Sequence, residues 1–141
     1  MFQINWKLKA FLYKVFQFLR LKKSLYFIQK YITRRSKINI LKIDPHWKRH
    51  ESSIRKNNCI NLLEIGAGKS LDQNIYLSYV FNNQLKQTAI DINKMIDFNL
   101  FNDASLIISN LLNLKFKGKV TSQEEVLNKY NIQYLAPHKL S

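Results

Sequence analysis

The stretch Asn61-Leu-Leu-Glu-Ile-Gly-Ala-Gly-Lys-Ser70 decides the fold. The apolar run before the glycines holds a single acid, Glu64, and breaks at once into Gly66-Ala67-Gly68. A buried parallel strand ends in this way where its backbone must pass close to a ligand, because glycine has no side chain and accepts a positive φ. A second short run, Thr88 to Ile92, contains another acid, Asp91. Strand, glycine turn, helix, strand and acid together are typical of half a nucleotide-type site.

Two known phosphate-binding patterns could also explain this glycine turn. A dinucleotide-binding loop needs G-x-G-x-x-G, and its third glycine would fall on Leu71. A P-loop needs G-x-x-x-x-G-K-[ST]; Gly68-Lys69-Ser70 fits its end, but its first glycine would fall on Leu63, inside the strand. An ordinary strand–turn–helix without a ligand is the remaining alternative. It leaves two acids at two strand ends without a structural reason, since a buried carboxylate is costly.

The segment Glu64-Ile-Gly66-Ala-Gly68-Lys-Ser70 resembles the cofactor loop of the class I S-adenosylmethionine-dependent methyltransferases, which are Rossmann-like. The resemblance covers about residues 59–137, with Ser70 in place of the family's last glycine. It implies that S-adenosyl-L-methionine is the cofactor and that Glu64 lies near its methionine end. Gly66, Ala67 and Gly68 would pass under its sugar and amino-acid portion. Asp91 would bind the ribose hydroxyls, and Ile92 would pack on the adenine.

The order of elements from residue 59 onward predicts a parallel α/β sheet. We expect strands at 60–65, 87–92 and 132–136, a helix over about 70–83, and a helix over about 104–113 that begins at an Asp103 N-cap. The capping box Ser122-Gln-Glu-Glu125 predicts a short helix to about 129. The chain order β-α-β-α-α-β implies right-handed crossovers. The predicted fold class is therefore α/β, a partial Rossmann-like parallel sheet of about three strands with helices.

The family's sheet has about seven strands, and this sequence supplies three. After the third strand come Pro137, His138 and Lys139, with no acid where the resemblance implies an adenine contact. We therefore expect the N-terminal half of a methyltransferase, encoded by a truncated reading frame, with weak or no cofactor binding and weak or no activity alone. No catalytic residue is assigned. The methyl acceptor stays open, with a small molecule or a glycan favoured over RNA.

The charge of the chain is distributed unevenly. Residues 1–56 carry a net charge of +13, whereas residues 57–141 carry +1. We therefore divide the chain into a basic helical N-terminal segment, 1–56, and an incomplete Rossmann-like domain, 57–141. Residues 5–20 predict an amphipathic helix, with Leu8, Phe11, Leu12, Val15 and Leu19 on one arc. A second helix is expected over 24–35, and Asp44-Pro45 marks a turn before a further helix that includes Lys48 to Lys56.

Three interpretations of the basic segment stay open: a helical cap on the sheet, peripheral contact of residues 1–36 with an anionic membrane, and RNA binding. The alternative to an enzyme is thus a non-enzymatic membrane- or RNA-associated module. Cys59 is the only cysteine, which fits a reducing compartment. Because no secretory signal is evident either, we expect a cytoplasmic protein. If residues 1–36 contact a membrane, it would be the inner face of that membrane. His46 and His50 have a helical metal-ligand spacing but no third ligand, so we predict no metal.

Overall fold

A computed structural model describes residues 38–91 and 94–136, which belong to a unit that begins at Ile38. The boundary that we predicted at residue 56 lies inside this unit. The predicted helices at 5–20 and 24–35, the interpretations of the basic segment and the adenine contact of Ile92 fall outside the described residues. In the described part, no helix has the length and apolarity that crossing a membrane requires.

Three strands form one parallel sheet in the order β1-β2-β3. They are β1 (Asn61–Ile65), β2 (Lys86–Ile90) and β3 (Ile132–Leu135). Four helices accompany them: α3 (Pro45–Lys56), α4 (Asp72–Val80), α5 (Phe98–Leu111) and α6 (Gln123–Tyr130). The predicted order β-α-β-α-α-β is confirmed, and the strand ends agree with the prediction to within two residues.

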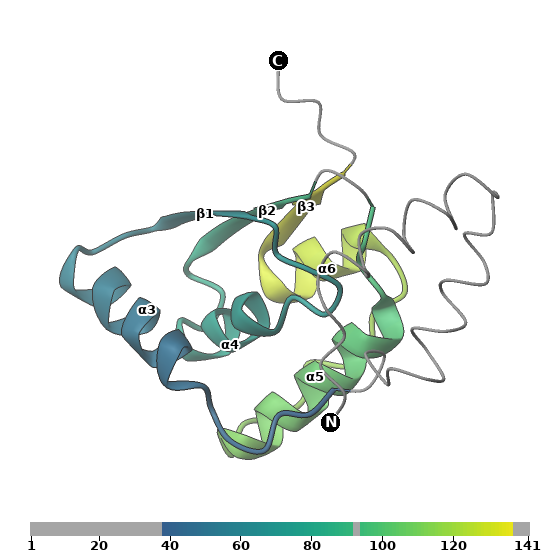
Figure 1. The fold of residues 1–141 in the computed structure, drawn as a ribbon, viewed down its shortest axis with the longest axis horizontal. Coiled ribbons are helices and arrows are strands. Elements are labelled where there is room, and N and C mark those ends of the chain that lie inside the picture. The colour runs from purple at the N-terminus through teal and green to yellow at the C-terminus, as the bar shows by residue number, and fades with distance from the viewer. Residues whose placement is uncertain (1–37, 92–93, 137–141) are drawn as a thin grey trace, which may run out of the picture. The chain divides into compact units, whose positions relative to one another are not determined.

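The helices of the described residues, α3 to α6, all lie on one side of the sheet (Figure 1). Strand alternation shows the same division, because Ala89 and Ile132 on the helix side are fully buried while Leu63 and Ile65 on the other side are 61% and 70% exposed. Parallel sheets are normally covered on both faces. The described unit is thus a two-layer α/β structure, and one face of its sheet is bare.

The core lies between the sheet and the helices. Tyr130 of α6 is fully buried, and its ring packs edge-on against Phe101 of α5 at a centroid distance of 5.0 Å. A polar link crosses from α4 to β2: the Gln87 amide donates to the backbone oxygen of Asn74 at 3.1 Å, and the Asn74 amide donates to Gln87 Oε1 at 3.2 Å. These two hydrogen bonds satisfy the buried side-chain amides of Gln87 and Asn74 as donors, because an unpaired buried donor would destabilise the fold.

The start of α5 differs from the prediction. The N-cap is Asp97, six residues before the expected Asp103, and the helix begins at Phe98. The Asp97 carboxylate accepts from the backbone N–H of Asn99 at 3.0 Å and of Leu100 at 3.3 Å. Asp103 lies inside the helix and is exposed. Both aspartates fit the N-cap pattern, and burial of Phe101 within the helix favours the earlier one.

The predicted helix over 70–83 is shorter at both ends, since α4 spans Asp72–Val80. It ends where Asn82 and Asn83 adopt positive φ angles of 48° and 62°, a conformation that asparagine tolerates and a helix does not. The capping box before α6 is formed in part. Ser122 Oγ accepts from the Glu125 N–H at 3.2 Å, whereas the Glu125 carboxylate accepts from the Thr121 N–H at 2.6 Å.

Candidate functional site

The glycine turn and Asp91 lie together at the carboxyl edge of the sheet. Ile65, the last residue of β1, is in register with Ile90, the last residue of β2. The Gly66 N–H then donates to the Ile90 carbonyl at 2.8 Å, so Gly66 lies beside Asp91. Ligands of open α/β sheets bind at this edge, outside the carboxyl ends of the strands.

The two glycines have the left-handed backbone that the sequence predicted. Gly66 has φ +78° and Gly68 has φ +81°, and a Cβ built on either would meet no heavy atom within 4 Å. The main chain of the turn is therefore open on the sides where side chains would project. Ala67 between them is half-buried and packs against the core, which fixes the turn from the inside. Gly66 is exposed and Gly68 is half-buried, and neither has a side chain that would keep a ligand from the backbone.

The backbone after the turn is held in place before α4 begins. The Asp97 N–H donates to the Lys69 carbonyl at 2.9 Å, which ties the turn to the start of α5. Leu71 then adopts a left-handed conformation, φ 54° and ψ 37°, and caps α4 without a side-chain hydrogen bond. In Asp72, the first residue of α4, the buried Oδ1 has no hydrogen-bond partner among the described residues, and burial raises the pKa of the carboxyl.

Asp91 is buried rather than open, with 3% of its surface exposed. Its Oδ2 accepts a hydrogen bond of 2.9 Å from the Tyr134 hydroxyl, which itself accepts from the Met95 N–H at 3.0 Å. Burial raises the pKa of Tyr134, and the neighbouring Asp91 carboxylate raises it further, so the phenol stays protonated and donates. A ligand that uses Asp91 must share this carboxylate with Tyr134 or displace the phenol.

Glu64 points to the helix side of β1, where it is half-buried. Burial raises the pKa of its carboxyl, and Asp91 adds to the increase, whereas Asn74, His50 and Gln73 favour the charged form. The Gln73 side-chain amide donates to Glu64 Oε2 at a distance of 3.4 Å. The two predicted acids are thus close enough to interact electrostatically. The structure brings Gly66 beside Asp91 and Glu64 within electrostatic reach of Asp91, and the binding role of these residues stays a prediction.

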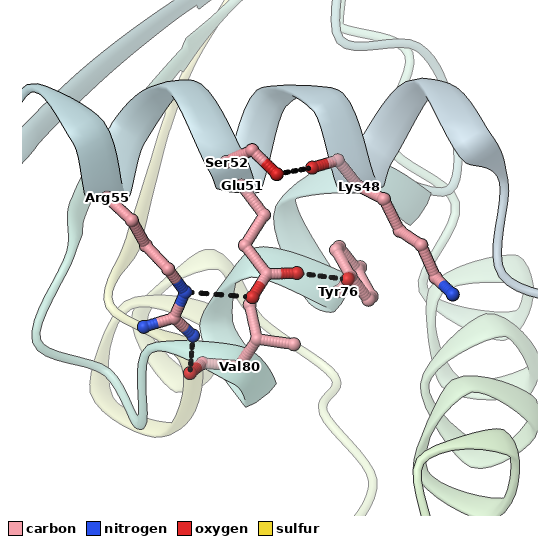
Figure 2. A network of polar contacts seen from close by, with 6 residues as sticks. All are labelled: Lys48, Glu51, Ser52, Arg55, Tyr76 and Val80. Atoms are coloured by element: carbon pink, nitrogen blue, oxygen red, sulfur yellow. Dashed lines mark hydrogen bonds and ion pairs between the residues drawn. The ribbon is translucent and has the colours of Figure 1, made fainter.

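Helix α3 is fixed to α4 by a network of polar contacts (Figure 2). The Glu51 carboxylate accepts from Arg55 Nε at 2.9 Å and from the Tyr76 hydroxyl, and Arg55 Nη2 donates to the Val80 carbonyl at 3.3 Å. These bonds tie α3 to α4, the helix that follows the glycine turn. His50, on the same helix, is one of the groups that lower the pKa of the Glu64 carboxyl.

The histidine pair of α3 has the geometry of neighbouring side chains on a helix, with ring centroids 4.2 Å apart. Among residues 38–91 and 94–136, no group of three or more His, Cys, Asp and Glu side chains could hold a metal ion. Trp47 packs against Tyr76 at a centroid distance of 5.7 Å. Its position on α3 therefore has a packing explanation.

Sequence reasoning missed Tyr134 and Gln73, which contact the two acids. Tyr134 is paired in register with Ala89, two residues before Asp91 on the same face of the sheet. Side chains alternate between the two faces of a strand, so an assumed parallel register could have placed Tyr134 and Asp91 on the same face of the sheet. Gln73 gave no such signal, because its contact depends on where α4 begins.

Comparison of the chain with protein-family models, curated proteins and solved structures finds no match in any of the three.

Proposed function

We propose that the chain binds S-adenosyl-L-methionine at the carboxyl edge of its sheet and takes part in methyl transfer to a small-molecule or glycan acceptor. The observation that supports this proposal is the open backbone of Gly66 and Gly68, both at positive φ, next to the Asp91 carboxylate. A nucleoside-bearing ligand needs a strip of bare main chain beside an acid that can accept from ribose hydroxyls. Both features occur here at the same edge.

The residues present fit this cofactor in kind. The turn 66–68 would supply bare backbone for the sugar and amino-acid portion, Asp91 would supply an acceptor for hydroxyls, and Glu64 would be placed toward the methionine end. When bound, the cofactor supplies an electrophilic methyl group. The residues of this chain would position it, and positioning is a large part of catalysis in a displacement reaction. No residue of the described part is assigned as a catalytic acid or base.

Tyr134 has a positioning role in this proposal. Its hydroxyl already donates to Asp91 Oδ2, and so holds the carboxylate at the edge of the sheet in one orientation. A carboxylate oxygen accepts more than one hydrogen bond. Ribose hydroxyls can therefore be added to the Tyr134 contact, with the carboxylate orientation set in advance.

Binding of S-adenosyl-L-methionine, measured by isothermal titration calorimetry on the full chain, tests the proposal. Gly66→Val should abolish binding, because the new side chain fills the space above the turn. Gly118→Val is the matched control, since Gly118 also has a positive φ of +89° but lies in the loop before α6. The control separates loss of the site from the general strain of a side chain at positive φ.

The acid at the second strand gives an independent variant. Asp91→Asn should weaken binding about tenfold to a hundredfold, since a hydrogen bond to a charged group contributes about 1.5–3 kcal/mol. Asp103→Asn, which changes an exposed acid inside α5, is the control and should leave binding unchanged. Absence of measurable binding by the folded wild-type chain contradicts the proposal, as does equal binding by the Gly66→Val variant.

A further inference from the structure

The open edge of β1 has features that suit another strand. Within the described residues, β1 has a strand neighbour on one side only, β2. Lys86 N–H donates to the Ile60 carbonyl and Gly66 N–H donates to the Ile90 carbonyl. In a parallel ladder the residues bonded to one neighbour alternate along the strand. The N–H and C=O groups of Asn61, Leu63 and Ile65 therefore face the open edge.

This edge lacks the usual protection of an edge strand. Lysine, proline, bulges and short length normally prevent edge strands from pairing with other chains. The five residues of β1 contain no lysine, proline or glycine, and their one charged side chain, Glu64, is turned to the helix side and half-buried. At the opposite edge of the sheet, β3 is followed in the sequence by Pro137, which has no N–H. The two edges are thus different, and β1 is the one suited to pairing.

The side chains of this edge are apolar and exposed. Ile60 is 70% exposed, Leu63 is 61% exposed and Ile65 is 70% exposed. Leu63 and Ile65 lie on the bare face of the sheet, where no described helix covers them (Figure 1). An edge with free backbone groups and exposed apolar side chains is a template for strand addition.

We propose that β1 pairs with β1 of a second copy of this chain, antiparallel about a two-fold axis at Leu63. A two-fold axis makes the interface self-complementary, so each copy covers the open edge of the other and no such edge remains. The result is a continuous sheet of both copies with β1 strands at its centre. This inference goes beyond the proposed function and does not depend on it.

The register follows from overlap and charge. An axis at Leu63 is the arrangement that pairs all five residues of β1: Asn61 with Ile65, Leu62 with Glu64, and Leu63 with itself. An axis one residue later would set the two Glu64 carboxylates opposite each other, and like charges in that position are destabilising. With the axis at Leu63, the two Leu63 side chains meet on the bare face with an Asn61–Ile65 pair on either side, and Glu64 meets Leu62 on the helix side.

The charge of the chain sets how pairing of two copies should depend on salt. The unit that holds the sheet, residues 38–141, has 13 Lys and Arg against 9 Asp and Glu, a net charge of +4, and the whole chain carries +14. Two copies therefore repel each other, and this repulsion opposes their close approach. Salt screens this repulsion. Dimerisation should therefore strengthen as the salt concentration rises.

Light scattering on the full chain measures the first consequence. At about 100 µM, well above a micromolar dissociation constant, the expected mass is twice the 16.8 kDa of the chain. Leu63→Lys should raise the dissociation constant about tenfold or more, since two lysines would then face each other across the axis. Because Leu63 is exposed, this variant should keep its circular dichroism spectrum, and its melting temperature should match that of the wild type at concentrations where both are monomeric.

A cysteine variant tests the register itself. In a Cys59→Ser background, Leu63→Cys should form a disulfide between copies on mild oxidation, because residues that exchange both backbone hydrogen bonds have Cα atoms about 5.5 Å apart, within disulfide range. Gln133→Cys is the matched control, since Gln133 is exposed in the same row on the other edge strand. A monomeric wild type, a dimer that Leu63→Lys leaves intact, or cross-linking at Gln133 in place of Leu63 would each overturn the proposal.

Discussion

Leu71 is the residue where conformational strain and burial oppose each other most clearly. It is a leucine in the left-handed region, with φ 54°, and it is 1% exposed. The left-handed conformation costs a non-glycine residue about 1–2 kcal/mol. Loss of a buried leucine side chain costs about 2–5 kcal/mol. Burial is the larger effect, so the structure tolerates the strain. Any substitution that removes the Leu71 side chain should therefore destabilise the fold.

The two effects can be separated by comparing alanine and glycine at this position. Both Leu71→Ala and Leu71→Gly remove the buried side chain, but glycine alone also removes the strain. In a helix interior glycine is less stable than alanine by about 1 kcal/mol. At Leu71 we expect the reverse order, with Leu71→Gly more stable than Leu71→Ala by about 1 kcal/mol. This reversal is the prediction.

Urea denaturation of the full chain gives the free energies of unfolding. The same pair of substitutions at Leu77, a fully buried residue inside α4, is the control, and there alanine should be the more stable variant. If Leu71→Ala were equal to or more stable than Leu71→Gly, the left-handed conformation at the start of α4 would be refuted. A change in the slope of the transition would instead indicate a change in the denatured state.

Two further predictions concern side chains away from the sheet edge. Burial lowers the pKa of Lys117 from 10.5 to about 8. Between these values the unfolded state binds more protons than the folded state, so the free energy of unfolding should rise with pH. Relative to Lys117→Met, the free energy of unfolding of the wild type should therefore increase from pH 7 to 9.5, and a constant difference would contradict this. Because Ser122 caps α6, Ser122→Ala should destabilise the fold by about 1 kcal/mol and Ser122→Gly by a few tenths of a kcal/mol. Equal thermal stability of both variants and the wild type would contradict this capping role.

The sequence predicted the order of the elements because each has a strong local signal. The strand before Gly66 is apolar and ends in glycine, and Ser122 opens a helix that the structure shows to begin at the next residue. The helix start at Asp97 was not predicted, since Asp97 and Asp103 are equally good caps locally. The choice between them depends on burial of Phe101, which is a tertiary effect.

The site was predicted in part for the same reason. Positive φ angles at Gly66 and Gly68 follow from residue type, and the parallel register brings Asp91 beside them. The burial of Asp91 under Tyr134 could not be read from either local sequence, because the two residues are 43 positions apart. A carboxylate that looked like an open ligand contact is in fact already held by a phenol.

Strand parity explains why the two sides of this edge differ in character. The side chains of Glu64 and Tyr134 lie on the helix side of the sheet, and the Asp91 carboxylate accepts a hydrogen bond from the Tyr134 hydroxyl on that side. Ile65, Ile90 and Leu135 form an apolar row across the three strands on the bare face. In the proposed function, the polar groups of a ligand at the glycine turn would therefore meet the helix side, and the apolar row would be left for packing. Because both surfaces begin at β1, the strand that ends in the glycine turn also provides the edge that we propose for dimerisation, so the two proposals can be tested on the same element with different residues.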